Sequence, residues 1–250
     1  MRAIVRGAAA LLFLSVAAGG VAADTLRVGG TGGALDMMRH VGKAFTAASG
    51  EDVDIAMSLG TSGALRALAD GVLDIAVSAR LLTPEEMAPG FVVVPIARTA
   101  LIFATSHRNP NSLASADLAS VFAASRPTWA DGKPIRLVLR TRLDADTMLI
   151  SDIFPGMREA VETARARQDL PVTATDQDNT KLGAALEGSL IIGGLSQLEM
   201  EKGDLRYVPI DGVLPSLAAF ESGAYRYEKV FYPVFPARRS AAAQLTQAVA

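Results

Sequence analysis

The stretch Leu26-Arg-Val-Gly-Gly-Thr-Gly-Gly-Ala-Leu35 places a short apolar strand, four glycines and a threonine directly before a helical pattern that begins near Ala34. Glycine tolerates positive φ and, because it lacks a Cβ, lets a ligand approach the backbone closely. The first amides of a helix have no acceptor within the helix, and the helix dipole makes that end electropositive. The stretch therefore predicts an anion cradle that needs no charged side chain, although the same glycines also suit an ordinary strand-to-helix connection.

A second turn of the same design follows at residues 58–65, Ser-Leu-Gly-Thr-Ser-Gly-Ala-Leu, after an alternating strand at residues 53–57. Thr61 and Ser62 lie at the expected N-cap, where a hydroxyl can satisfy the free amides of the helix. The same hydroxyls can donate to a bound oxyanion. The next strand, residues 73–78, ends at Ser78 and is followed by Arg80, which fits either a ligand contact or a surface arginine.

A third polar turn, residues 140–147, follows a buried strand at residues 135–139 and contains two arginines, two aspartates and two threonines. Arg140 stands where a guanidinium could clamp an oxyanion with two hydrogen bonds. The alternative is that Asp144 and Asp146 cap the following helix and pair with the arginines.

Strands alternate with helices along the whole chain, which indicates an α/β class with largely parallel sheets. Ligands of such sheets gather beyond the carboxyl ends of the strands, where all three polar turns lie. We expect two lobes joined by crossing strands near residues 100–105 and 205–209. Lobe 1 would comprise residues 24–102 and 205–250, and lobe 2 residues 103–204.

Residues 1–23 have the pattern of a secretory signal peptide: Arg2 and Arg6, an apolar run, and small residues before Asp24. Its removal would leave 227 of the 250 residues, with 22 basic and 26 acidic side chains. We therefore expect a periplasmic protein, and the mild acidity argues against nucleic acid as a partner. The chain has no cysteine, which excludes disulfides, iron–sulfur clusters and thiol catalysis.

Enzymatic alternatives have little support in the sequence. The turn at residues 60–63 is not the nucleophile elbow G-x-S-x-G, and a hydrolase using Ser62 would need a base. His40 and His107 are the only histidines, and we expect both to be solvated surface residues. No spacing of ligands suggests a transition metal, so we predict neither a metal site nor a cofactor.

The order of these motifs resembles the phosphate-binding component of bacterial ABC transporters, in the type II periplasmic binding-protein superfamily. The similarity extends from about Leu26 to Pro236, and its most specific part is the turn at residues 58–68 followed by Gly-Val-Leu-Asp-Ile-Ala-Val-Ser-Ala-Arg-Leu at residues 71–81. The resemblance implies two lobes, each a mostly parallel mixed sheet flanked by helices, that close on one small anion. It also implies a monomer that delivers phosphate to a membrane permease and is not an enzyme.

Three positions depart from the family's pattern. Gly33-Ala34 replaces a Thr-Phe pair, Ala79 replaces an acid, and Asp144-Ala-Asp-Thr147 replaces Gly-Ser-Gly-Thr. Two carboxylates at an anion site are unfavourable unless arginines neutralise them, so a sensor or carrier of another small polar ligand stays open as an alternative. The chain also stops before the family's usual terminal helix and strand, as a truncated or divergent member would. The candidate ligand-binding residues, from the turns and the resemblance together, are Thr31, Gly33, Ala34, Thr61, Ser62, Ser78, Arg80, Arg140, Ala145, Asp146 and Thr147.

Overall fold

The computed structural model describes residues 25–237. The signal peptide predicted for residues 1–23 lies outside the described residues, as does the incomplete helix that the sequence pattern predicts from Arg239. In this part of the chain, no helix is long and apolar enough to cross a membrane.

Twenty-one elements follow one another between residues 25 and 237. They are β1 (Leu26–Gly30), α1 (Gly32–Ser49), β2 (Val53–Ile55), α2 (Gly60–Ala69), β3 (Ile75–Ser78), α3 (Pro84–Met87), β4 (Phe91–Val93), β5 (Ala97–Thr105), η1 (Ser115–Asp117), α4 (Leu118–Ala123), β6 (Arg136–Leu137), β7 (Leu139–Arg140), α5 (Ala145–Ile153), α6 (Met157–Arg165), β8 (Val172–Thr173), α7 (Asp176–Ala185), β9 (Ser189–Gly194), α8 (Leu195–Glu201), β10 (Arg206–Tyr207), α9 (Leu217–Glu221) and β11 (Glu228–Pro236).

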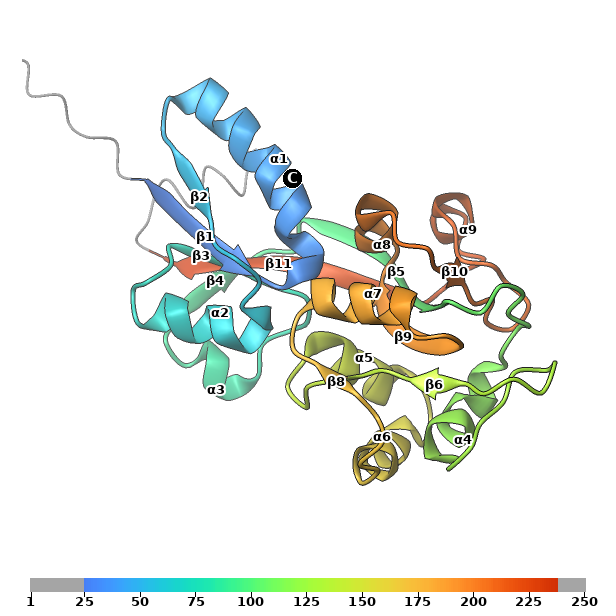
Figure 1. Cartoon of the computed structure of the whole chain (residues 1–250). Coiled ribbons are helices and arrows are strands. Elements are labelled where there is room, and N and C mark those ends of the chain that lie inside the picture. Colours follow the sequence, from blue (N-terminus) through green and yellow to red (C-terminus); the bar gives the residue numbers. More distant parts are fainter. Residues whose placement is uncertain (1–24, 238–250) are drawn as a thin grey trace, which may run out of the picture.

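One mixed sheet runs through both lobes in the order β2-β1-β3-β11-β5-β9-β6 (Figure 1). β1 pairs in parallel with β2 and β3, and β6 pairs in parallel with β9. β11 and β5 pair antiparallel with each other and join the two parallel groups. The predicted α/β class with two lobes and two crossing strands is confirmed.

The second crossing strand differs from the one that the sequence predicts. Residues 206–207 form β10, which pairs with Ala104 and Thr105 of β5 and stays on the lobe 2 side. β11 crosses instead: its first residues pair with β5, and its last residues pair with β3 and β4. Residues 205–209 and β11 are both rich in apolar residues, and their long-range pairing partners show which of the two crosses.

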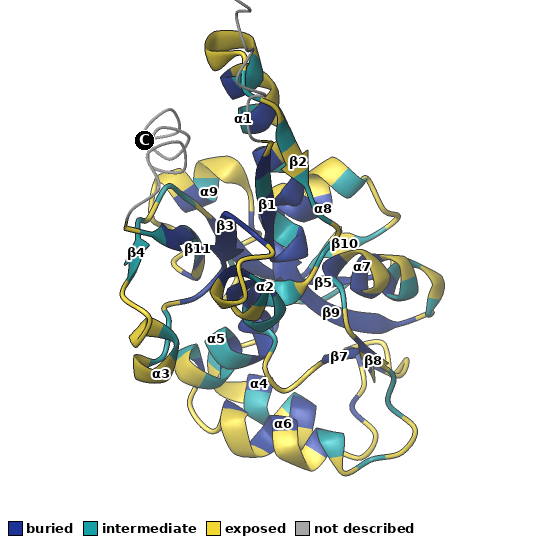
Figure 2. Ribbon diagram, turned by 90° about the vertical axis from the view of Figure 1, so that its left-hand side faces the viewer, coloured by how far each residue is buried: buried dark blue, intermediate teal, exposed yellow. Residues whose placement is uncertain are grey.

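Lobe 1 is a three-layer unit because its strands are apolar on both faces. α1 covers one face through a cluster that includes Val28, Met38 and Phe45, and α2 covers the other through Leu65 and Leu68. Figure 2 shows β1 and β3 among the most deeply buried parts of the molecule and β4 as partly buried, with exposed residues on the outer sides of the helices. The lobe 2 core is a separate, larger cluster around Phe103, Phe122 and Phe154.

The glycines of the first turn are required by close packing. A Cβ on Gly30 would lie 2.4 Å from the carbonyl oxygen of Val77 on the neighbouring strand, so only glycine lets β1 and β3 pair there. The second turn is different, because α2 already begins at Gly60, which has a φ of +64°. The predicted turn at residues 60–63 is therefore the first turn of the helix.

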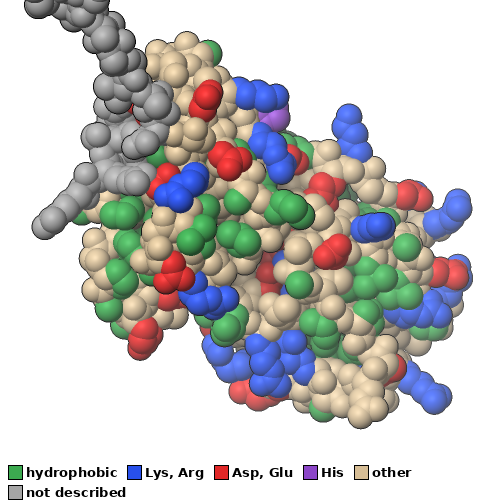
Figure 3. Space-filling view, turned by 60° about the vertical axis from the view of Figure 1, so that its left-hand side comes forward, with side chains coloured by type: hydrophobic (Ala, Val, Ile, Leu, Met, Phe, Trp, Pro, Cys, Tyr) green, Lys and Arg blue, Asp and Glu red, His purple; other side chains and the backbone are tan. Residues whose placement is uncertain are grey.

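Charges of both signs are intermixed on the face shown in Figure 3. The full sequence carries 24 basic and 26 acidic side chains, a formal net charge of −2. Such a surface offers no extended field of one sign.

Candidate functional site

The N-terminus of α1 holds a carboxylate from the other lobe. Asp176, the first residue of α7, accepts a hydrogen bond from the Gly33 amide at 3.0 Å and one from the Thr31 hydroxyl at 3.4 Å, both at Oδ2. Thr31 is the N-cap of α1, yet its side chain makes no capping bond to its own helix. We call the Thr31 hydroxyl and the Gly33 amide the α1 cradle. At this turn, where the sequence predicts an anion cradle, both donors are bonded to a carboxylate of this chain.

Glycine at position 32 permits this approach. A Cβ on Gly32 would lie 2.6 Å from Asp176 Oδ2. The neighbouring Ala34 takes another role, because its amide donates to the Thr31 carbonyl at 3.1 Å and its side chain is buried in the lobe 1 core.

Arg140, at the end of β7, reaches the same carboxylate from lobe 2. Its Nη2 donates to Asp144 Oδ2 at 2.7 Å and to Asp176 Oδ1 at 3.4 Å, and its Nη1 donates to the Thr175 carbonyl. Burial alone would lower the pKa of Arg140, but Asp144 and Asp176 outweigh it and raise this pKa. The alternative given for the third turn holds for Asp144, which pairs with Arg140 and caps α5 by accepting from the Asp146 amide at 3.0 Å, whereas among residues 25–237 the Asp146 side chain neither caps the helix nor pairs with an arginine.

A buried lysine completes the cluster. Lys229 of β11 places its Nζ 2.6 Å from Asp146 Oδ1, and each side chain is 1% exposed. Burial raises the pKa of Asp146 to about 6 despite the opposing effect of Lys229. Burial would lower the pKa of Lys229, but Asp146 and Asp176 outweigh it and raise this pKa. We call Arg140, Asp144, Asp146, Asp176 and Lys229 the ionic centre.

The ionic centre contains three carboxylates and two cations within the described residues. Burial would raise the pKa of Asp176, but Lys229, Arg140 and the Gly33 amide outweigh it, so this pKa is lowered. Asp146 Oδ2 has no hydrogen-bond partner among residues 25–237, and neither has Gln197 Oε1 nearby. Asp146 is therefore the carboxylate with the weakest compensation.

A second group of predicted site residues is bonded within lobe 1. The Thr61 hydroxyl accepts from the Ala79 amide at 3.1 Å, and the Ser78 hydroxyl donates to the Arg80 carbonyl at 2.6 Å. Arg80 is buried, and its guanidinium pairs with Glu86 of α3 at 2.7 and 2.8 Å. The hydrogen bonds and the ion pair of these three side chains connect the end of β3 to α2 and α3.

Ser62 lies at the boundary between the lobes. Its hydroxyl accepts from Arg80 Nη2 at 3.1 Å and donates to the Leu143 carbonyl of lobe 2 at 3.5 Å. A cavity of about 250 Å³ opens here between residues 59–63 and residues 141–144. The second and third polar turns thus face each other across this interlobe cavity, with Asp144 of the ionic centre in its wall.

The start of α5 packs between the lobes as well. Ala145 is buried against the lobe 1 cluster that contains Phe231, and Thr147 is buried two residues further on. The Thr147 carbonyl accepts from the Ser151 hydroxyl at 2.7 Å. Ala145 therefore brings the start of α5 into contact with lobe 1.

The prediction for His107 is wrong. Its ring is 6% exposed, stacks on Trp129 with ring centroids 5.2 Å apart, and lies 3.4 Å from an Asp131 oxygen. An aromatic partner from a distant turn buries it, which sequence spacing does not reveal. His40 is exposed as predicted, and no group of three potential metal ligands occurs among the described residues.

Sequence reasoning missed Lys229 and Asp176 as site residues, since the pattern at residues 176–179 predicts only a helix N-cap. One signal for Lys229 was available: it shares a strand face with the buried Phe231, whereas a lysine normally avoids such a face. Asp176 carried no comparable signal, because an acidic residue in the first turn of a helix is ordinary.

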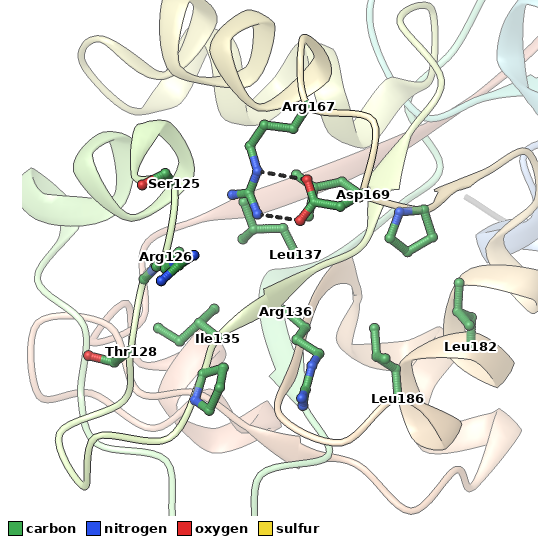
Figure 4. Close-up of a pocket in the computed structure, with 14 residues that line it drawn as sticks. Ser125, Arg126, Thr128, Ile135, Arg136, Leu137, Arg167, Asp169, Leu182 and Leu186 are labelled. Atoms are coloured by element: carbon green, nitrogen blue, oxygen red, sulfur yellow. Dashed lines mark hydrogen bonds and ion pairs between the residues drawn. The ribbon is translucent and has the colours of Figure 1, made fainter.

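A larger cavity, of about 770 Å³, lies on lobe 2 away from these residues (Figure 4). Apolar side chains such as Ile135, Leu137 and Leu182 line it, together with Arg126 and Arg136. None of the predicted site residues lies in its wall, and we base the candidate site on the converging polar groups between the lobes.

Known proteins share this fold. A protein from Clostridium perfringens, described as a phosphate ABC transporter substrate-binding protein with bound phosphate, matches at 17% identity and a TM-score of 0.78. The match covers 90% of this chain and 93% of the C. perfringens chain. An ABC-type phosphate transport receptor from Vibrio cholerae matches at 14% identity and a TM-score of 0.63, and the match covers 90% of this chain and 93% of the receptor. The CcmR regulatory domain from Synechocystis, in complex with 2-PG, matches at 12% identity and a TM-score of 0.59, and the match covers 90% of this chain and 95% of that domain.

No match was found among curated proteins. The family description "PBP superfamily domain" matches residues 15–250, nearly the whole chain. The chain therefore belongs to the periplasmic binding protein (PBP) superfamily.

Proposed function

We propose that this protein is an exported, monomeric, non-catalytic solute-binding protein that captures a small oxyanion between its lobes and delivers it to an ABC permease. The observation that carries the proposal is the convergence of the Gly33 amide, the Thr31 hydroxyl and the Arg140 guanidinium on one carboxylate group. Backbone amides at a helix N-terminus together with a guanidinium recognise phosphate by the same hydrogen bonds. The phosphate bound to the structurally similar C. perfringens protein supports phosphate as the first ligand to test.

Calorimetric titration of residues 24–250 with phosphate, sulfate, molybdate and small organic acids tests the proposal. We expect phosphate to give a heat of binding. If none of the oxyanions gives a heat of binding, the protein is not an oxyanion carrier. Arg140→Ala should weaken phosphate binding by more than tenfold, because a hydrogen bond to a charged group contributes about 1.5–3 kcal/mol.

Arg142→Ala is the matched control for this titration. Arg142 is two residues away, but its side chain is 68% exposed and pairs with Glu162 at 2.6 Å. We expect phosphate affinity close to that of the unchanged protein. An equal loss in both variants would show that Arg140 acts only through general electrostatics.

A small organic acid is the second candidate ligand. A cavity of about 420 Å³ lies next to Ser62 and Arg80 and is lined by apolar residues that include Leu65, Phe91 and Met148. Pockets for small organic molecules are typically about 300–1,000 Å³. The CcmR domain, which shares the fold, holds 2-PG. Heat with organic acids alone would favour this candidate over phosphate.

A further inference from the structure

The group that lies in the α1 cradle is supplied by the opposite lobe. Asp176 belongs to α7 of lobe 2, whereas Thr31 and Gly33 belong to lobe 1. Its two carboxylate oxygens divide the available donors: Oδ2 accepts from Gly33 and Thr31, and Oδ1 accepts from Arg140. The arrangement is that of a bound oxyanion, with the anion tethered to α7.

The cradle has no room for a second anion while Asp176 is present. The carboxylate approaches the backbone so closely that a Cβ on Gly32 would lie 2.6 Å from Oδ2. The Asp176 side chain is buried, and the Gly33 amide, the Thr31 hydroxyl and the Arg140 guanidinium already donate to it. A free oxyanion that uses the Gly33 amide and Arg140 must therefore replace this carboxylate.

The charge balance favours such a replacement. With Asp176 in place, the ionic centre has three carboxylates and two cations, and one more anion would be strongly unfavourable. Without Asp176, Asp144 and Asp146 balance Arg140 and Lys229. A bound oxyanion would then replace the negative charge of the Asp176 carboxylate in the ionic centre.

We propose that Asp176 is a built-in competitor for the solute: it occupies the α1 cradle, holds the two lobes together without a ligand, and must leave before an oxyanion binds. The bridge from α7 to α1 closes the lobes as a ligand would. The nature of the displaced anion rests on the proposed function, whereas the bridge between the lobes does not.

A distance measurement tests the bridge without any ligand. Because the chain has no cysteine, Lys43→Cys on α1 and Glu159→Cys on α6 give one spin label on each lobe, both at exposed positions (Figure 1). In phosphate-free buffer, Asp176→Ala should shift the label-to-label distances measured by double electron–electron resonance to longer values. Asp178→Ala, an exposed aspartate two residues along α7, is the control and should leave them unchanged. An unchanged distribution in Asp176→Ala overturns the proposal.

Phosphate affinity provides the second readout. We expect Asp176→Ala to bind phosphate at least tenfold more tightly than the unchanged protein, and Asp178→Ala to bind it equally. Equal or weaker binding by Asp176→Ala would reject the competitor while leaving the oxyanion carrier intact. If no variant binds any oxyanion, the proposed function fails and the label distances alone decide on the bridge.

Gly32→Ala guards against loss of folding in Asp176→Ala. The added Cβ pushes the carboxylate out of the cradle while all charges of the ionic centre remain, and alanine suits a first-turn helix position. We expect the same shift to longer label distances as in Asp176→Ala. Short distances in Gly32→Ala would contradict the bridge.

Discussion

Lys229 keeps its charge in a fully buried position because Asp146 lies 2.6 Å away and Asp176 adds a second negative charge. A buried ion pair is weak evidence for net stability, since desolvation of both charges offsets their attraction. Removal of one partner is different, because it leaves the other charge buried without compensation. The pair therefore makes the folded state sensitive to any change that affects only one of its members.

Lys229→Met should lower the free energy of unfolding by about 3–5 kcal/mol, the range measured for broken buried pairs. The reason is that Asp146, already short of hydrogen-bond donors, would lose its nearest cation. Urea denaturation followed by circular dichroism measures the loss. The double variant Lys229→Met/Asp146→Asn should regain most of it, and Lys133→Ala, at an exposed lysine, should change little. A double variant no more stable than Lys229→Met would refute the pairing.

Asp146 should also give the protein a pH-dependent stability. Its pKa of about 6 exceeds the ordinary value of 3.8, so between these values the folded state binds more protons than the unfolded state. Stability contributed by the protonated form is therefore fully present below pH 3.8 and is lost as the pH rises through 6. The loss is at most about 3 kcal/mol, since one pKa unit corresponds to about 1.4 kcal/mol.

Urea denaturation at several pH values from about 4 to 7 measures this slope. Asp176 does not contribute to the slope in this window. Its pKa is lowered in the folded state, so the stability that its charged form contributes is lost only as the pH falls below the ordinary pKa of 3.8. The slope attributed to Asp146 should be absent in Asp146→Asn. If the variant keeps the slope, another group titrates there.

The helices and strands of lobe 1 could be predicted well because each begins at a local signal. The glycine turn before α1 and the Thr83-Pro84 start of α3, whose capping box is fully formed, depend on neighbouring residues only. β6 and β7 were predicted as one strand, residues 135–139, because four of the five residues in this run are apolar. They separate because Arg136 and Leu137 pair with β9, whereas Leu139 and Arg140 pair with β8.

The candidate site was only partly predictable, because several of its contacts join residues that are far apart in the sequence. The three turns and Arg140 follow local patterns of strand end and helix start. The contacts of Asp176 with Gly33 and of Lys229 with Asp146 join residues 143 and 83 positions apart, and no local pattern specifies which distant group an acid or lysine will meet.

Two glycines at strand-to-helix junctions should respond oppositely to alanine. Gly30→Ala should destabilise the protein by more than 1 kcal/mol, on the order of an overpacked core site, because its Cβ would lie 2.4 Å from the Val77 carbonyl. Gly63→Ala in α2 should stabilise it by about 0.5–1 kcal/mol, since its Cβ meets only Leu59 at 3.4 Å and alanine favours a helix. Urea midpoints of the two variants compare them directly, and a stable Gly30→Ala would mean that β1 can move away from β3.

At the scale of the whole molecule, β5 and β11 join both lobes into one sheet, while their cores remain separate clusters. Closure of the lobes therefore depends on the contacts between them: Asp176 with α1, Ser62 with Leu143, and Ala145 with the lobe 1 core. A solute bound between the lobes adds to these contacts and links the stability of both halves.

Phosphate at one hundred times its dissociation constant should raise the free energy of unfolding by about 2.7 kcal/mol. Both lobes should show the increase, because the proposed ligand contacts come from α1 and from β7. The single tryptophan, Trp129, reports on lobe 2 by its fluorescence, and a fluorophore at Lys43→Cys reports on lobe 1. An increase confined to one reporter would place the anion outside the interlobe site.

The position of Lys229 has a mechanical consequence. In a rigid rotation of one body against another, a point near the axis sweeps a short arc and a distant point a long one. Lys229 stands on the β5–β11 pair, where two strands that bend or twist would carry the rotation. We therefore expect its ammonium group to stay almost stationary beside Asp146 while Asp176 and Gly33 travel apart, so that an approaching solute meets a positive charge that is already in place.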